Sequence, residues 1–337
     1  MSNQPVTAQR IEYLDVAKCI GILCIHLGHY NEGVSWLYPL VWQFHVPLFF
    51  FLAGCSETLA HDKPFKTYFM GKVKRLLLPW AVFAVFYLVI QSIDKTYDLY
   101  TTVGYLTGIF KGCIRNTYDP AHALWFLTCL FCMSILFFFL KKLNKWYFIL
   151  AVAFVAAWLT GTMIPVIPSL PWNFDGALYY LPLYALGYVC FPLIKRLFNG
   201  GGIPVLVVGV LCLGYTACQY YGKDMMYPLG AIPGVAVLLP IFRALPSILG
   251  IMVVSQYASR CSLLARMGRE SLYLCCNETL MVLLFNGAIS CMGLKFEPAG
   301  PLSIVILASF LMYLSYRFVV PVEKQAIAWF EKRVFPR

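Results

Sequence analysis

The sequence predicts an all-α fold, a polytopic transmembrane bundle of about ten helices. Of its 337 residues, 61% are hydrophobic and 12% are charged, whereas soluble proteins carry about 25% charged residues. Apolar runs of about 20 residues, the length of a helix that crosses a bilayer, recur along the whole chain. Helices are expected because backbone groups in lipid must be hydrogen-bonded within the segment.

Ten runs are predicted to span the membrane. They lie at residues 12–30, 36–59, 76–94, 121–140, 146–164, 176–197, 203–221, 228–257, 269–292 and 300–321. The eighth run is too long for one straight crossing and too short for two. Pro240 and Pro246 are expected to kink it around Arg243, and a re-entrant segment stays open. With no internal repeat, residues 1–337 are expected to form one membrane domain.

The basic residues predict the orientation of the bundle. If both termini are cytoplasmic, 19 of the 26 Lys and Arg residues fall in cytoplasmic segments, 5 fall outside and 2, Lys18 and Arg243, lie within spans. Such an excess on one side is typical of cytoplasmic loops. The same distribution explains the net charge of +11 without a nucleic-acid partner. The cysteines lie mostly inside apolar runs, and no spacing typical of a metal site occurs.

The first run, YLDVAKCIGILCIHLGHY, carries four ionisable side chains: Asp15, Lys18, His26 and His29. A charged group at the centre of a membrane helix costs about 2.5–3.5 kcal/mol, and such groups usually serve a function. Lys18 and His29 are eleven positions apart, which places them on one helix face about 16 Å apart. A snorkelling Asp15–Lys18 pair with hydrogen-bonded histidines is the alternative.

The second run contains WQFHVPLFFFLAG, in which His45 precedes Pro47. Proline leaves a backbone carbonyl one turn earlier without its usual donor. His45 is expected to face the bundle near the outer end, where it could approach His29. A packed structural histidine is an equal alternative.

These motifs resemble the acyltransferase-3 family of integral membrane enzymes, which O-acylate carbohydrates. The most specific are D-x(2)-K-x(10)-H in the first run, from Asp15 to His29, and FHVPLFFFLAG in the second. Weaker matches are KVKRLLLP, HALWFL and the late GRESLYL. Within the family, the chain looks most like the fucose 4-O-acetylase-like branch, which includes polysaccharide and enterobacterial-common-antigen acetyltransferases.

The resemblance implies that Lys18 and His29 form the catalytic pair. It also implies cytosolic acetyl-CoA as the acyl donor. The family's late motif often ends in a histidine, whereas this sequence has Asn277 and Glu278 in CCNETL. The role of that histidine is therefore unassigned here.

A mechanism for acyl transfer follows from these residues. His29 is the expected general base, Asp15 would hold Lys18 in place, and His45 or His26 would orient the base or donate to the oxyanion. Phosphates of acetyl-CoA would bind basic residues at the cytosolic side. The predicted donor-binding residues are Lys18, Lys72, Lys74 and Arg75, although the last three could serve orientation alone. No metal is expected.

The acceptor is expected to be a carbohydrate or glycolipid that enters from outside or from the lipid. The residues predicted to bind it are His26, Asn31, Glu32, His122, Trp125, Asn277 and Glu278. Acceptor identity, acetyl against succinyl transfer and oligomeric state are not determined by the sequence. The family implies a bacterial inner membrane.

A proton-coupled transporter or exporter is the main alternative, because transporters also place Asp, Lys and His inside helices. Such folds usually contain two matching halves. Here the ionisable residues gather toward the N-terminal end, which favours the enzyme.

Overall fold

The computed structural model describes residues 10–29, 36–60, 62–93, 99–113, 123–163, 170–220, 222, 226–232, 234–295 and 300–336. Over these residues the chain is helical, with no strand. The α-helices are α1 Glu12–His29, α2 Leu37–Trp42, α3 His45–Thr58, α4 Phe65–Lys72, α5 Leu78–Ile93, α6 Leu99–Phe110, α7 Leu124–Leu140, α8 Trp146–Met163, α9 Phe174–Tyr179, α10 Leu181–Gly200, α11 Gly202–Tyr220, α12 Leu239–Ala258, α13 Ser262–Arg269, α14 Ser271–Cys276, α15 Glu278–Cys291, α16 Pro301–Leu314 and α17 Val320–Val334.

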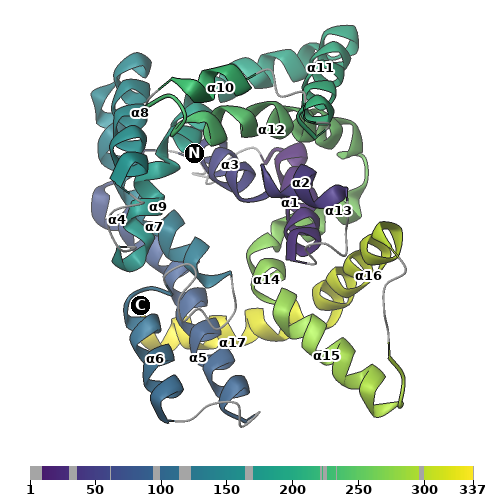
Figure 1. The fold of residues 1–337 in the computed structure, drawn as a ribbon. Coiled ribbons are helices and arrows are strands. Elements are labelled where there is room, and N and C mark those ends of the chain that lie inside the picture. Colours follow the sequence, from purple (N-terminus) through teal and green to yellow (C-terminus); the bar gives the residue numbers. More distant parts are fainter. Residues whose placement is uncertain are drawn as a thin grey trace, which may run out of the picture.

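The all-α polytopic prediction is confirmed. Eight helical stretches among the described residues are long and apolar enough to cross a membrane. The two other predicted spans correspond to α1, which contains Glu12, Asp15 and Lys18, and to the segment that includes α15, which has 14 residues. Figure 1 places α1, α3 and α12 in the middle, between α8, α10 and α11 on one side and α5, α15 and α17 on the other.

Two predicted spans are broken helices. The second span divides at Gln43 and Phe44 into α2 and α3. Pro47 lies in the first turn of α3, where its missing N–H costs nothing. The ninth span divides at Asn277 into α14 and α15, without a proline or glycine at the break.

Two spans have different ends from those predicted. The third was expected to begin at residue 76, but α4, η2 (Val73–Leu77) and α5 follow one another without a break from Phe65. The tenth was expected to end at 321, but η6 (Ser315–Val319) joins α16 directly to α17. Both η2 and η6 are π-helical and precede a proline, whose missing N–H favours a widened turn.

The eighth span was expected to begin at residue 228 and to be kinked around Arg243. The helix α12 begins only at Leu239 and has 20 residues, enough for one crossing. Pro240 lies in its first turn, and Pro246 lies inside it. A short 3-10 turn, Tyr227–Ala231, precedes it, so the excess length belongs to a connection.

Glycines allow two helix pairs to pack closely. A Cβ atom on Gly54 of α3 would overlap the Tyr184 carbonyl of α10, and one on Gly187 would overlap the Phe51 carbonyl. A Cβ on Gly268 of α13 would overlap the Asp15 carbonyl of α1. Small residues permit such backbone contact between membrane helices, and α1 is fixed beside α13 in this way.

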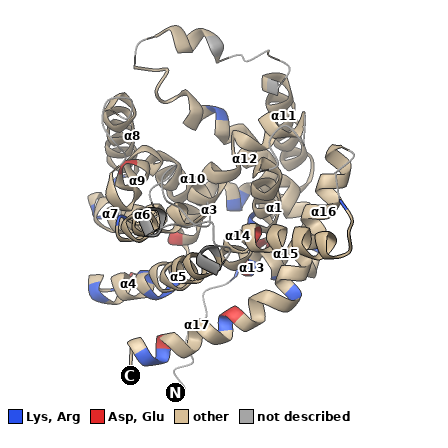
Figure 2. Ribbon diagram, turned by 60° about the horizontal axis from the view of Figure 1, so that its bottom comes forward, with Lys and Arg blue, Asp and Glu red and all other residues tan. Residues whose placement is uncertain are grey.

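Charged residues are unevenly distributed over the helices. Figure 2 shows that α17 carries alternating acidic and basic residues, while most of the other ribbon is uncharged. Lys74 of η2 pairs with Glu331 of α17 at 2.9 Å, and Lys324 of α17 pairs with Glu270 at 2.7 Å. These pairs fix α17 across the ends of two other segments.

Candidate functional site

A cavity of about 1240 Å³ lies among the helices. Its wall includes two histidines, His29 and His45, and the charged residues Glu57, Lys63 and Lys72. The remaining wall is largely apolar and aromatic. A cavity of this size can hold an extended ligand, and it joins several of the residues predicted from the sequence.

His29 is the last residue of α1, and its Nδ1 lies 2.6 Å from Oε1 of Glu278. The Glu278 side chain is 8% exposed, and that of His29 is 36% exposed. An ionised carboxylate only accepts hydrogen bonds, so Nδ1 carries a proton in this pair. In the neutral ring, Nε2 is therefore the atom that can accept a proton.

The break at Asn277 explains why Glu278 can reach His29. Glu278 is the first residue of α15 and follows directly on Asn277, the residue at which α14 ends. The N-terminus of a helix carries a partial positive charge that stabilises an acidic side chain. The break thus places a buried carboxylate where its negative charge is favoured, next to the histidine of α1.

His45 lies beside the same end of α1. Its ring is close enough to Gly28 that a Cβ there would lie 3.8 Å from Cε1 and 3.9 Å from Nε2 of His45. Nδ1 of His45 donates to the Val41 carbonyl at 2.9 Å. That bond fixes the tautomer, because a carbonyl cannot donate. In a neutral His45, Nε2 is then an acceptor and not a donor.

Lys18 lines the cavity and pairs with the buried carboxylate of Asp15. Its Nζ lies 3.2 Å from Oδ1 of Asp15, whose Oδ2 accepts from Nε of Arg10 at 2.7 Å. Asp15 is buried and is not part of the cavity wall. The Asp15 carboxylate therefore pairs with Lys18 from outside the cavity, while Lys18 itself lines the cavity wall.

A second buried carboxylate, Glu57 of α3, lies in the wall. Lys72 and Lys141 approach its two oxygens at 3.5 Å each. The hydroxyls of Tyr68 and Tyr184 donate to its Oε2 at 3.1 Å. Charge-assisted hydrogen bonds of this kind compensate for burial, so Glu57 links four helical segments at the cavity.

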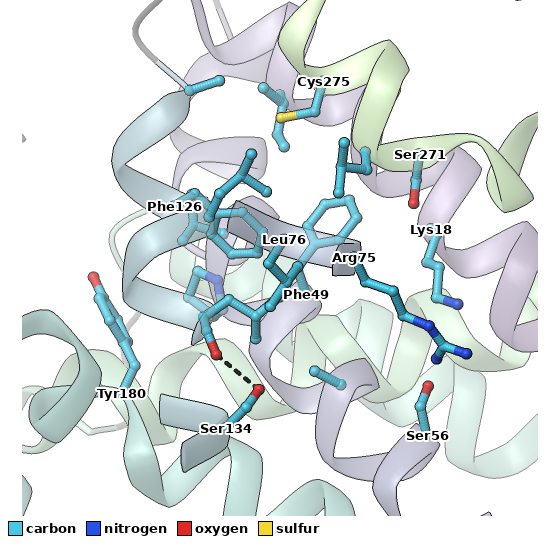
Figure 3. Close-up of a pocket in the computed structure, with 18 of the residues that line it drawn as sticks. Lys18, Phe49, Ser56, Arg75, Leu76, Phe126, Ser134, Tyr180, Ser271 and Cys275 are labelled. Carbon is cyan, nitrogen blue, oxygen red and sulfur yellow. Dashed lines mark hydrogen bonds between the residues drawn. The ribbon is translucent and has the colours of Figure 1, made fainter. Parts of the chain in front are cut away.

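The basic residues of KVKRLLLP point in different directions. Lys72 and Arg75 line the cavity, whereas Lys74 pairs with Glu331 of α17. Figure 3 shows Lys18 and Arg75 extending toward the same part of the cavity, with Ser56 next to the Arg75 guanidinium. The predicted donor-binding set is thus divided, with Lys74 facing away.

The predicted acceptor-binding residues are only partly brought together. Trp125 lines the cavity, but His26, Asn277 and Glu278 are buried outside its wall. Glu278 instead contacts His29. Asn31, Glu32 and His122 lie outside the described residues.

Several wall residues were not predicted from the sequence. Glu57 is an ionisable residue within a predicted span, and that signal, applied to the first helix alone, could have found it. Arg243 was noted only beside the proline kink, although it also lines the cavity. Tyr68 gave no sequence signal because its role depends on contacts with other helices.

Taken together, these groups can move a proton and bind an anion. The pair of His29 and Glu278 forms an oriented base. Lys18, Lys72 and Arg75 supply positive charge along the same cavity. Within the part of the chain that the structure describes, no group of three or more His, Cys, Asp or Glu side chains could hold a metal ion.

The comparisons with known proteins add one match. The model of the acyltransferase domain of the acyltransferase-3 family matches residues 11–169. This stretch contains the wall residues His29, His45, Lys18, Lys72 and Arg75. Residues 11–169, a little under half of the chain, are therefore similar to the acyltransferase-3 family. No curated protein and no solved structure matches.

Proposed function

We propose, from the match of residues 11–169 to the acyltransferase-3 domain model, that this chain is a membrane O-acetyltransferase. It moves an acetyl group from cytosolic acetyl-CoA to a hydroxyl group of a carbohydrate. The acceptor class rests on the resemblance of its motifs to the fucose 4-O-acetylase-like branch. The proposed location is the inner membrane of a bacterium.

The observation that carries this proposal is the contact between His29 and Glu278 at the wall of the cavity. Glu278 keeps the proton of the neutral ring on Nδ1 and leaves Nε2 available. It also stabilises the imidazolium that forms when Nε2 takes a proton. A base that is oriented in this way is what O-acyl transfer requires.

The proposed reaction follows from that geometry. Nε2 of His29 removes the proton of the acceptor hydroxyl while the hydroxyl oxygen bonds to the acetyl carbonyl carbon. The carbon–sulfur bond then breaks, and His29 returns the same proton to the departing thiolate. His29 and Glu278 end in their initial protonation states, so one turnover needs no other proton donor.

The cations of the wall fit the donor. Lys72 and Arg75 would bind phosphate groups, Lys as a point charge and Arg with two parallel hydrogen bonds. Lys18, held by Asp15, would guide the donor along the cavity toward His29. Loss of Lys18 should therefore weaken donor use, whereas loss of His29 should remove the chemical step.

His45 has a narrower role than expected. With Nδ1 donating to Val41, the neutral ring presents an acceptor at Nε2. It can then orient an acceptor hydroxyl by accepting its hydrogen bond. Donation to the oxyanion would require a protonated His45.

The test is transfer of labelled acetyl from acetyl-CoA by the purified protein in nanodiscs. A pool of lipid-linked and free glycans is supplied, and wild type is compared with His29→Gln. We expect labelled glycan with wild type only, and the labelled product identifies the acceptor. Acetyl-CoA binding without transfer would mean that the pool lacks the acceptor. Absence of both binding and transfer would contradict the proposal and favour the transporter.

A further inference from the structure

One hydroxyl from a third helix bridges the break between α14 and α15. Tyr87 of α5 donates to the Cys276 carbonyl at 2.6 Å, and its oxygen accepts from the Leu280 N–H at 3.2 Å. Tyr87 is fully buried. A single oxygen atom thus connects the last residue of α14 to the third residue of α15.

Both groups that Tyr87 binds lie at the break, one at the end of α14 and the other in the first turn of α15. A helix leaves its last carbonyls and first N–H groups without partners inside the helix. In soluble proteins water can satisfy these groups, but a break inside a membrane needs a protein partner. Side chains that accept from the N–H of the third residue are the usual caps of a helix N-terminus. Here the cap comes from another helix.

Asn277 holds the break from the other side. Its Nδ2 donates to Oγ of Ser315 at 3.2 Å and to Oε2 of Glu323 at 2.8 Å. These partners lie in η6 and α17, so the turn is fixed between α5 and the C-terminal helices. Figure 1 shows α5, α14, α15 and α17 meeting in the lower half of the molecule.

Glu278 is the residue immediately after this turn. Its backbone is bounded by Asn277 on one side and by the capped N–H of Leu280 on the other. Its carboxylate lies against Nδ1 of His29. A shift of the turn would move the carboxylate away from a ring that α1 holds independently.

We propose that Tyr87 is a positioning residue. Its hydroxyl sets the place of Glu278, and through Glu278 it keeps the proton of His29 on Nδ1. The effect on catalysis rests on the proposed function of His29 as the base. The effect on the His29 ring itself does not, and it can be measured without any substrate.

The chain offers a matched control. Tyr13 of α1 is also a buried tyrosine, but its hydroxyl has no hydrogen-bond partner among the described residues. Tyr87→Phe and Tyr13→Phe each remove one buried oxygen. Only the first removes a contact to the break, so a general effect of buried hydroxyl loss would appear in both variants.

The experiment is nuclear magnetic resonance of the full chain in nanodiscs with ¹⁵N-labelled histidine. The His29 signal is assigned by its loss in His29→Gln. In wild type we expect a protonated Nδ1 with a downfield proton, because a short hydrogen bond to a carboxylate deshields it. Glu278→Gln should lose this proton signal. Tyr87→Phe should reduce its intensity by at least half, and Tyr13→Phe should leave it unchanged.

Steady-state kinetics, with the acceptor that the labelling experiment identifies, form the second readout. Tyr87→Phe should lower turnover about 10-fold, by analogy with the loss of about 10-fold or more when a partner of a metal-bound histidine is removed, with KM within about twofold. An unchanged His29 signal in Tyr87→Phe would overturn the proposal, as would equal losses in Tyr87→Phe and Tyr13→Phe. A changed signal in a protein without transferase activity would leave the positioning role intact and reject the proposed function instead.

A second variant covers the case in which Tyr87→Phe does not fold. Asn277→Ala loosens the same turn from the side of η6 and α17. It should reduce the downfield His29 signal in the same direction. If a folded Asn277→Ala retains the full signal, the turn does not position Glu278 and the proposal is wrong.

Discussion

At the residue scale, three buried carboxylates decide how the basic groups of the cavity behave. Asp15, Glu57 and Glu278 each lie against a lysine or histidine of the wall. Removing a charge from water costs several kcal/mol unless a partner compensates. The carboxylates therefore compensate for the burial of these basic groups, which can meet an anionic donor in the cavity.

The neighbouring lysines of KVKR provide the first prediction. Lys72→Ala should raise KM for acetyl-CoA about 10-fold, because one charge-assisted contact is worth about 1.5–3 kcal/mol. Lys74→Ala should change KM less than twofold, since Lys74 pairs with Glu331 away from the cavity. Steady-state acetyl transfer measures both values. Equal effects of the two variants would show that orientation in the membrane, and not donor binding, is the function of these charges.

The Glu57 cluster provides a prediction about stability. Glu57→Ala leaves Lys72 and Lys141 without their shared buried partner and should destabilise the protein by about 3 kcal/mol. Asp62 also pairs with Lys141, at 3.0 Å, but its side chain is 95% exposed. Asp62→Ala should therefore cost less than about 1 kcal/mol. Thermal unfolding in the same detergent compares the two, and a similar loss in both would contradict a structural role for Glu57.

Sequence reasoning found the local contacts at this scale and missed the distant ones. Asp15 and Lys18 are three positions apart on one helix, so their contact follows from helical geometry. His29 and Glu278 are 249 positions apart. Glu278 was expected to bind the acceptor, because nothing in a single sequence indicates which helix packs beside α1.

At the scale of elements, close packing of α3 against α10 fixes the cavity wall. His45, Glu57 and the aromatic side chains of α3 depend on the position of that helix. Gly54 and Gly187 bring the two backbones into contact. Neither backbone can move aside easily, because both helices are buried along this contact.

A glycine pair tests this packing. Gly54→Ala should destabilise the protein by at least about 3 kcal/mol, the upper range for overpacking, because the added Cβ meets backbone. Gly214 of α11 has no atom within 4 Å of an added Cβ, so Gly214→Ala should be neutral or stabilising by up to about 1 kcal/mol. The fraction of monodisperse protein after heating, measured by size-exclusion chromatography, reports both. An equally stable Gly54→Ala would show that α3 and α10 can separate.

Helix existence was predictable, but helix breaks were not. Apolar length predicted the regions of the ten spans, because burying apolar surface in lipid depends on composition. The break at Asn277 is bridged by the Tyr87 hydroxyl, which lies 189 positions away from Cys276 in the sequence. The break at Gln43 had a signal in Pro47, which we interpreted only as a freed carbonyl.

At the scale of the whole molecule, the orientation derived from the basic residues has a direct test in native cysteines. Cys261 and Cys291 are exposed. Cys261 follows α12 at the end predicted to be cytoplasmic, and Cys291 ends α15 at the end predicted to be outside. The two residues should therefore lie on opposite faces of the membrane.

An impermeant maleimide added to intact cells should label Cys291 and leave Cys261 unlabelled. In permeabilised cells both cysteines should be labelled. The variants Cys261→Ser and Cys291→Ser identify which labelling signal belongs to which cysteine. Labelling of Cys261 alone in intact cells would show that the topology is opposite to the predicted one. It would also place His29 toward the cytoplasm, so the cavity would no longer bring a cytosolic donor toward an external acceptor.

The π-helical turn η2 has a consequence for insertions and deletions. Its widened turn holds one residue more than an α-helix would, immediately before the α5 segment that carries Tyr87. Deleting one residue between Val73 and Leu77 would convert it to a regular turn. The widened turn already accommodates the extra residue, so the segment before it would keep its orientation relative to α5. Lys72 would stay beside Glu57 and Tyr87 would keep its place, whereas a one-residue deletion between Leu78 and Tyr87, in regular helix, would rotate Lys72 by about 100° relative to Tyr87.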